Sequence, residues 1–227
     1  MRKSHIGAVM LAVALTGTMA PTAQAQSDEA VAAAVALMLT PAGSFANVSP
    51  AALGNSATSL GADYGRYTGD GERSSYGLHL DWRSLRATLG VGTQTGLENV
   101  WMAGVSAGRT MFSATALQVG LEGDAGFGRV KDDETSATLN AMSAGARVPF
   151  SMTLSSDAVT FVPYLAPGGF FGRLSSEGES ESGFRMTLNG GVRLGFSNGV
   201  AVDVGLQRIF IDNAETLFGV GLSLARW

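Results

Sequence analysis

The chain of 227 residues contains no cysteine. This absence excludes a disulfide framework, a thiolate metal site, a cysteine nucleophile and a lipid-modified N-terminal cysteine. Histidine is nearly absent as well, since His5 and His79 are its two examples. Basic runs are missing and the formal net charge is −4, so a nucleic-acid partner is not expected.

Long apolar runs are also missing beyond the N-terminus. The longest lies at 30–39, whereas a membrane-spanning helix needs about 20 apolar residues. Charged residues make up only 15% of the chain, and the 31 glycines are about twice the usual share of roughly 7%. A glycine-rich, weakly charged chain without a spanning helix predicts β-structure.

The N-terminus has the pattern of a secretory signal peptide. Arg2 and Lys3 precede an apolar run at 6–15, and small residues lead to the A-x-A site that ends at Ala25. We expect cleavage after Ala25. A retained anchor is the alternative, but the apolar run is too short to span a bilayer.

Residues 26–56 differ from the rest of the chain. An alanine-rich stretch that Ser27 could cap ends at Thr40-Pro41, and a Gly/Ser/Asn/Pro-rich segment follows. We expect a short helix and a linker. Two alternatives stay open, a periplasmic leader and a plug inside a barrel.

Residues 57–227 alternate with the period of two that β-strands require. In nearly every segment one face is apolar and the other carries Gly, Ser, Thr and charges. Pro163 and Pro167 predict a bulge or break in one segment. We prefer ten strands, with eight as the alternative. The segments are 57–66, 76–83, 85–92, 101–107, 117–127, 142–150, 158–172, 184–196, 200–207 and 218–225.

The connections between these segments fall into two classes. Long polar ones lie at 67–74, 93–99, 130–134, 174–183 and 211–215. Shorter ones lie at 83–84, 109–115, 151–157 and 197–199, the last with the Asn-Gly pair typical of hairpins. Long loops at one end and short turns at the other are typical of outer-membrane barrels.

Aromatic residues gather at the ends of the expected strands. Such girdles flank the apolar band of a membrane barrel, whereas a soluble lipocalin-like barrel, the alternative fold, has no reason to form them. The expected girdle residues are Trp82, Trp101, Phe127, Phe150, Phe184, Phe196, Phe210, Phe218 and Trp227, with Phe170 and Phe171 on the long-loop side.

The chain ends in FGVGLSLARW, an alternating strand with a terminal aromatic. This ending resembles the C-terminal signature of small Gram-negative outer-membrane β-barrels of the OmpA, OmpX, OmpW and opacity type. The resemblance implies a closed antiparallel up-and-down barrel in the outer membrane, assembled by the insertion machinery, in contact with lipid and lipopolysaccharide. Trp227 is out of phase with Leu224, so either 225–226 form a bulge or the last residues leave the strand.

The polar faces place mixed charges in the barrel interior. In a narrow barrel these should pair and fill the lumen. The alternative is a narrow pore that they line around water. The expected lumen residues are His79, Asp81, Arg83, Arg86, Glu122, Asp124, Arg147, Arg185, Arg193 and Asp203.

Catalysis is not expected. His79 and Asp81 share one face of a strand, but no matching serine motif accompanies them. Asp132-Asp133-Glu134 lack a known Ca²⁺ spacing, so neither a metal nor a cofactor is expected. Divalent ions could still bridge the acidic loops to lipopolysaccharide. We therefore expect a monomeric, structural or adhesion-type membrane protein, with a narrow pore and an enzyme using His79 as alternatives.

Overall fold

The computed structural model describes residues 58–67, 73–94, 97–131, 138–176, 179–210 and 216–226. The expected signal peptide, its cleavage at Ala25, the helix and linker at 26–56, the plug and Trp227 lie outside these residues. No helix in the described ranges is long and apolar enough to cross a membrane.

The described residues form twelve strands in one antiparallel sheet. The alternation of the sequence produces them, because successive side chains on a strand point to opposite faces. They are β1 (Thr58–Tyr67), β2 (Arg73–Trp82), β3 (Leu85–Gln94), β4 (Leu97–Ala114), β5 (Leu117–Lys131), β6 (Thr138–Arg147), β7 (Phe150–Met152), β8 (Leu154–Ser155), β9 (Val159–Ser176), β10 (Glu179–Phe196), β11 (Val200–Phe210) and β12 (Thr216–Arg226).

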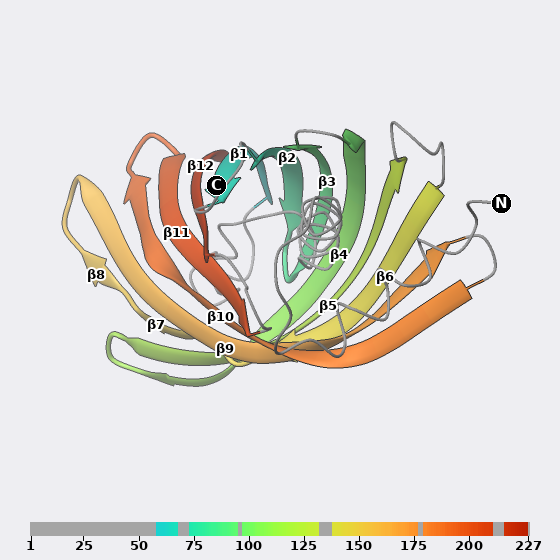
Figure 1. The fold of residues 1–227 in the computed structure, drawn as a ribbon. Helices are drawn as coiled ribbons and strands as arrows, with labels where there is room; N and C mark the ends of the chain where they lie inside the picture. Colours follow the sequence, from blue (N-terminus) through green and yellow to red (C-terminus); the bar gives the residue numbers. More distant parts are fainter. Residues whose placement is uncertain are drawn as a thin grey trace, which may run out of the picture.

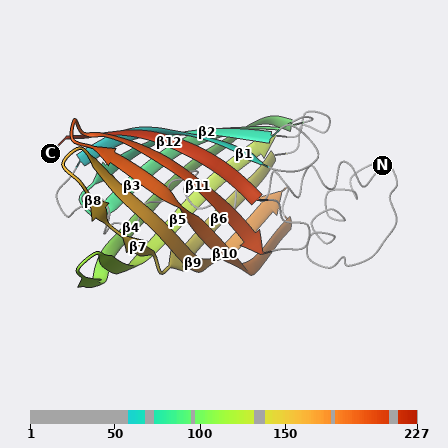
Figure 2. The same ribbon diagram turned by 90° about the vertical axis from the view of Figure 1, so that its left-hand side faces the viewer.

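The sheet closes on itself into a ten-stranded barrel, which confirms the preferred strand number and excludes eight. β1 pairs with β12, and β9 pairs with β10 on one side and with β6, β7 and β8 on the other. β6 and the short strands β7 and β8 therefore together occupy the place of one broken strand. Figure 1 shows β12 and β1 side by side, and Figure 2 shows the inclined strands of the wall.

Connection lengths differ between the two ends. Short turns at 83–84, 115–116, 156–158 and 197–199 join the strands at one end, hereafter the short-turn end. At the opposite, long-loop end, the strands leave 68–72, 95–96, 132–137, 177–178 and 211–215 between them. The long loops predicted at 93–99 and 174–183 are therefore wrong, because the strands on either side extend until two residues remain. Strands continue there because backbone pairing does not need apolar side chains.

The expected break at Pro163 and Pro167 lies instead in the strand that faces them. β9 runs unbroken, whereas its neighbour is interrupted at 148–149 and at 153. The Val148 amide donates to the Pro167 carbonyl over 2.9 Å, so the polar groups of Pro167 point toward this broken strand. Pro163 lies four residues earlier and points the same way. Because the two prolines face the interrupted strand, their missing amide hydrogens remove few hydrogen bonds from the sheet.

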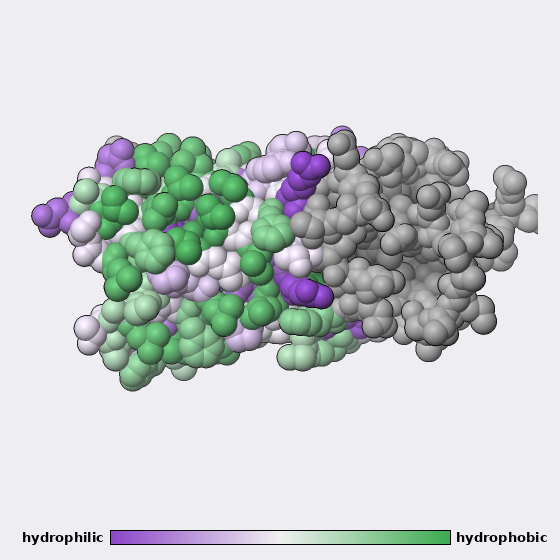
Figure 3. Space-filling view, turned by 60° about the vertical axis from the view of Figure 1, so that its left-hand side comes forward, coloured by the Kyte–Doolittle hydropathy of each residue, from purple (hydrophilic) through white to green (hydrophobic). Residues whose placement is uncertain are grey.

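The apolar faces of the strands point outward and the polar faces point inward. Leu78, Leu89, Leu222 and Leu224 are more than half exposed, whereas many serines and charged residues are buried inside. Figure 3 shows the resulting apolar band, with hydrophilic side chains concentrated at its edges. A soluble barrel would place its apolar face inside, so this arrangement is that of a membrane barrel.

Most girdle aromatics lie on the outside. Trp82, Trp101, Phe127, Phe150, Phe184, Phe210 and Phe218 are exposed, and Phe196 is half-buried. The expectation for Phe170 is wrong, because this ring is buried inside the barrel with Met102 and Leu174. Phe170 and Phe171 are neighbours on β9, so only one of them can face outward.

The end of β12 contains no bulge. Ala225 pairs with Ser59 and Arg226 pairs with Thr58 in unbroken register. The alternative of a bulge at 225–226 is therefore wrong.

Candidate functional site: the charged lumen

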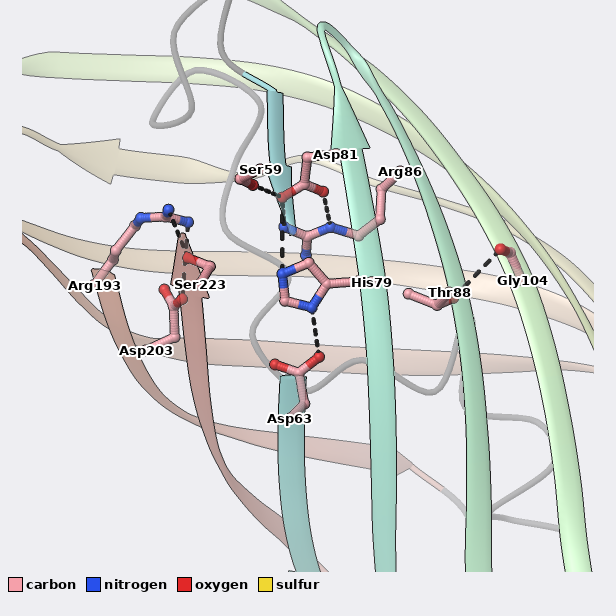
Figure 4. A network of polar contacts seen from close by, with 10 residues as sticks. All are labelled: Ser59, Asp63, His79, Asp81, Arg86, Thr88, Gly104, Arg193, Asp203 and Ser223. Carbon is pink, nitrogen blue, oxygen red and sulfur yellow. Dashed lines mark hydrogen bonds and ion pairs between the residues drawn. The ribbon is translucent and has the colours of Figure 1, made fainter. Parts of the chain in front are cut away.

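A hydrogen-bonded cluster lines the barrel interior on β1, β2 and β3. The Ser59 hydroxyl donates to Asp81 Oδ2 over 2.7 Å. The Arg86 guanidinium donates hydrogen bonds to both oxygens of the same carboxylate, from Nε to Oδ1 and from Nη2 to Oδ2 at 3.0 Å. This two-pronged geometry is the strong form of an arginine–carboxylate pair. Figure 4 shows these side chains converging on Asp81.

His79 lies between two carboxylates. Its Nδ1 is 2.7 Å from Asp63 Oδ2, and its Nε2 is 3.8 Å from Asp81 Oδ2. The ring lies directly against residue 61, where a Cβ would be 2.3 Å from Nε2. Only glycine leaves room for the imidazole there.

A second cluster lies on β5 and β6. Arg147 Nη2 donates to Asp124 Oδ2 over 3.0 Å, and Arg147 Nε is 3.5 Å from Glu122 Oε2. Strand pairing places Arg147 directly opposite Glu122. One arginine thus forms ion pairs with two buried carboxylates, which would repel each other without it.

A third cluster lies on β10, β11 and β12. Arg193 pairs with Asp203 at 3.7 Å and donates through Nη2 to the Ser223 hydroxyl over 3.1 Å. Figure 4 shows Arg193, Asp203 and Ser223 in the same interior as the first cluster.

The carboxylates of the lumen outnumber its arginines. Asp63, Asp81, Glu122, Asp124 and Asp203 are buried, against the buried guanidinium groups of Arg86, Arg147 and Arg193. The described part of the lumen therefore holds five buried carboxyl groups and three buried guanidinium groups.

The structure brings together eight of the ten residues expected in the lumen, namely His79, Asp81, Arg86, Glu122, Asp124, Arg147, Arg193 and Asp203. Arg185 is half-exposed near the long-loop end, where its Nη1 donates to the Phe184 carbonyl over 2.8 Å. Arg83 is outside the lumen, contrary to the prediction. It lies in the β2–β3 turn with a φ of 56°, and its guanidinium is 5.3 Å from the centre of the Trp82 ring. Strand alternation ends at Trp82, so the period of two does not apply to Arg83.

Four further buried residues of the lumen were not expected from the sequence, namely Ser59, Asp63, Tyr164 and Ser223. Asp63 is in phase with Ser59 and opposite in phase to Leu60 and Tyr64, so the alternation of that segment could have placed it in the lumen. Tyr164 lies in the segment that is apolar on both faces, where no local signal shows which side chains point inward.

The described residues contain no group of three or more His, Asp or Glu side chains that could hold a metal ion. Asp132-Asp133-Glu134 lie outside them. His79 and Asp63 have the geometry of a base and its orienting acid. However, Ser59 donates to Asp81 rather than to His79, whose Nε2 has no hydrogen-bond partner.

No protein-family model and no curated protein matches the sequence. Among solved structures, the β domain of the Bordetella autotransporter BrkA matches with a TM-score of 0.51 and 11% identity, over 74% of this chain and 99% of that domain. The chain has the fold of the small outer-membrane β-barrels. Weaker matches to this barrel include the outer membrane enzyme PagL (TM-score 0.37, 14% identity, 74% of this chain and 97% of PagL) and the KdgM porin in complex with oligogalacturonate (TM-score 0.38, 11% identity, 74% and 99%). Fold likeness at this identity assigns no role to the barrel.

Proposed function

We propose that the protein is a non-conducting, non-catalytic outer-membrane barrel that holds acidic loops at the cell surface in a structural or adhesion-type role. The buried ion pairs of the lumen carry this proposal. Arg86, Arg147 and Arg193 each contact a carboxylate, and all three are buried. Charges in a low-dielectric interior are tolerated when paired in this way, and a paired network fills a narrow barrel.

The same proposal includes the route to the membrane. The chain is exported through a signal peptide that is cleaved after Ala25, and residues 26–56 form a helix and linker before the barrel at 57–227. The assembly machinery inserts the barrel, which then functions as a monomer. The A-x-A site and the alternating final strand support this route.

A narrow pore is the second candidate, and unpaired polar atoms favour it. Asp63 Oδ1, Asp203 Oδ1 and Arg193 Nη1 are buried without a hydrogen-bond partner among the described residues. Buried polar atoms are normally satisfied by protein or by water, so water inside the lumen would satisfy them. A continuous water-filled lumen that is wide enough for ions would conduct them.

An enzyme that uses His79 is not proposed. The imidazole side chain is 1% exposed, and its Nε2 faces the backbone of Gly61 and the carboxylate of Asp81 instead of a nucleophile. A substrate has no access to the ring in this arrangement.

Ion conductance separates the two candidates. The mature protein, residues 26–227, is folded in detergent, checked by heat-modifiable gel mobility and added to a planar bilayer, with an established porin as the positive control. We expect a folded but silent barrel. Discrete current steps whose ion selectivity changes in an Arg185→Glu variant would overturn the proposal and establish the pore.

A further inference from the structure

Four arginines project outward from the barrel close to its long-loop end. Each lies within the last four residues on that side of its strand, and each is exposed. We name them the arginine belt, which consists of Arg66 on β1, Arg129 on β5, Arg173 on β9 and Arg208 on β11. Lys131 adds a fifth outward basic side chain at the end of β5.

The height of the belt follows from its aromatic neighbours. Tyr64, Phe127 and Phe171 each precede a belt arginine by two residues, on the same outward face of the same strand. Aromatic girdles mark the boundary between hydrocarbon and headgroups. Two strand residues cover roughly 7 Å, so the guanidinium groups of Arg66, Arg129 and Arg173 reach the headgroup layer. On β11 the exposed Phe210 follows Arg208 by two residues, so Arg208 lies at the height of the girdle.

The belt has no acidic partners among the described residues. None of the four arginines forms an ion pair there. Asp63, Asp81, Glu122, Asp124 and Asp203 are buried inside the barrel, and Asp157 lies in a turn at the opposite end. The four guanidinium groups of the belt therefore face the lipid without an ion pair among the described residues.

Polar side chains lie between the arginines. Arg129 and Arg173 flank the single strand β6, and Asn140 on β6 pairs directly with Arg129. Arg66 and Arg208 flank β12, where Thr216 pairs with Arg208. The two arginines of each pair are staggered by two residues along the strand between them, since Arg173 pairs with Met142 and Arg66 pairs with Phe218. Strands two places apart are separated by roughly 10 Å, so with this stagger the Cα atoms of a pair lie roughly 12 Å apart, a span that one sugar-sized headgroup can bridge.

We propose that the arginine belt binds the phosphates of phosphorylated sugar headgroups of outer-leaflet lipids. Guanidinium groups bind phosphate through paired, charge-assisted hydrogen bonds, and basic side chains at a membrane surface attract anionic headgroups. This inference rests on the outer-membrane location in the proposed function. It differs from bridging by divalent ions, in which the loop acids would hold the lipid.

Binding of purified lipopolysaccharide tests the belt. The mature barrel in neutral detergent is titrated with a short-chain lipopolysaccharide and with the same lipid after enzymatic removal of its phosphates, both in chelator so that divalent bridging is absent. We expect the phosphorylated lipid to bind roughly tenfold to thirtyfold more tightly. An Arg129→Gln/Arg173→Gln variant should lose about half of the phosphate-dependent binding sites, because the Arg66/Arg208 pair remains.

Arg109→Gln is the matched control, because Arg109 is an exposed arginine on β4 toward the short-turn end of the barrel. It should retain the preference for phosphate. Equal binding of the two lipids by the unmodified barrel, or an equal loss in the Arg109→Gln variant, would overturn the inference. Should the first double variant not fold, Arg66→Gln/Arg208→Gln provides the same comparison on the other pair.

The two proposals fail separately. A folded, silent barrel without a phosphate preference overturns the belt and leaves the proposed function intact. A conducting barrel that prefers the phosphorylated lipid overturns the proposed function and supports the arginine belt.

Discussion

His79 keeps its place in the lumen because residue 61 is a glycine. The imidazole bridges Asp63 and Asp81, and the absence of a side chain at Gly61 allows the close approach. Buried polar networks are sensitive to such details, since a carboxylate that loses its partner keeps its full cost of desolvation.

Gly61→Ala should destabilise the barrel by about 1–3 kcal/mol, because the new methyl group displaces His79 and breaks its contact with Asp63. Unfolding by urea in lipid vesicles measures the change. Gly123→Ala is the control, since its Cβ would meet only the Gly145 carbonyl, at 3.7 Å, and should change stability little. A similar loss in both variants would show that the His79 contact is not the cause.

At the scale of elements, β9 accommodates two prolines because it faces a broken strand. The Pro167 carbonyl points to the side of β6 and β7, so its missing amide hydrogen removes nothing from the ladder with β10. Its partner Leu188 has the opposite orientation. The Leu188 backbone groups point toward Arg208 of β11, within an intact ladder.

Leu188→Pro should therefore prevent folding or cost several kcal/mol, because the proline ring removes an amide donor and leaves a backbone carbonyl of β11 unpaired within an intact ladder. Pro167→Ala should change the free energy of unfolding by less than about 1 kcal/mol. The fraction of heat-modifiable folded protein after dilution into vesicles measures both variants. Equal tolerance of both substitutions would contradict this assignment of hydrogen-bonding sides.

At the scale of the whole molecule, the barrel has the reverse of the polarity pattern of a water-soluble protein. Its apolar side chains face outward and its ion pairs lie inside, so lipid rather than a protein core covers the band. Leu222 lies near the centre of β12, whereas Thr58 lies where β1 begins, at the short-turn end.

Leu222→Arg should cost about 2–4 kcal/mol in a bilayer, because a charge near the midplane is poorly solvated, and Thr58→Arg should cost at most about 1 kcal/mol at the interface. Unfolding by guanidinium chloride in vesicles measures both. A Leu222→Arg variant as stable as the unmodified barrel would mean that this surface does not lie in hydrocarbon.

The period of two in the sequence was sufficient to predict a ten-stranded barrel, its apolar outside and the inward placement of residues such as Asp124 and Arg193. Alternation is a local property, so it can be read from neighbouring residues alone. It failed where alternation ends or becomes ambiguous, at Arg83 in a turn and at Phe170 beside Phe171.

The tertiary structure alone decided which charges meet. Asp63 and His79 are 16 residues apart in the chain, and Arg193 and Ser223 are 30 apart. These contacts follow from the register between strands and from the closure of β12 onto β1. Register depends on pairing between distant segments, and a shift of one residue would turn every side chain to the other face. A single sequence determines the faces of each strand, and the closed barrel determines which side chains come into contact across them.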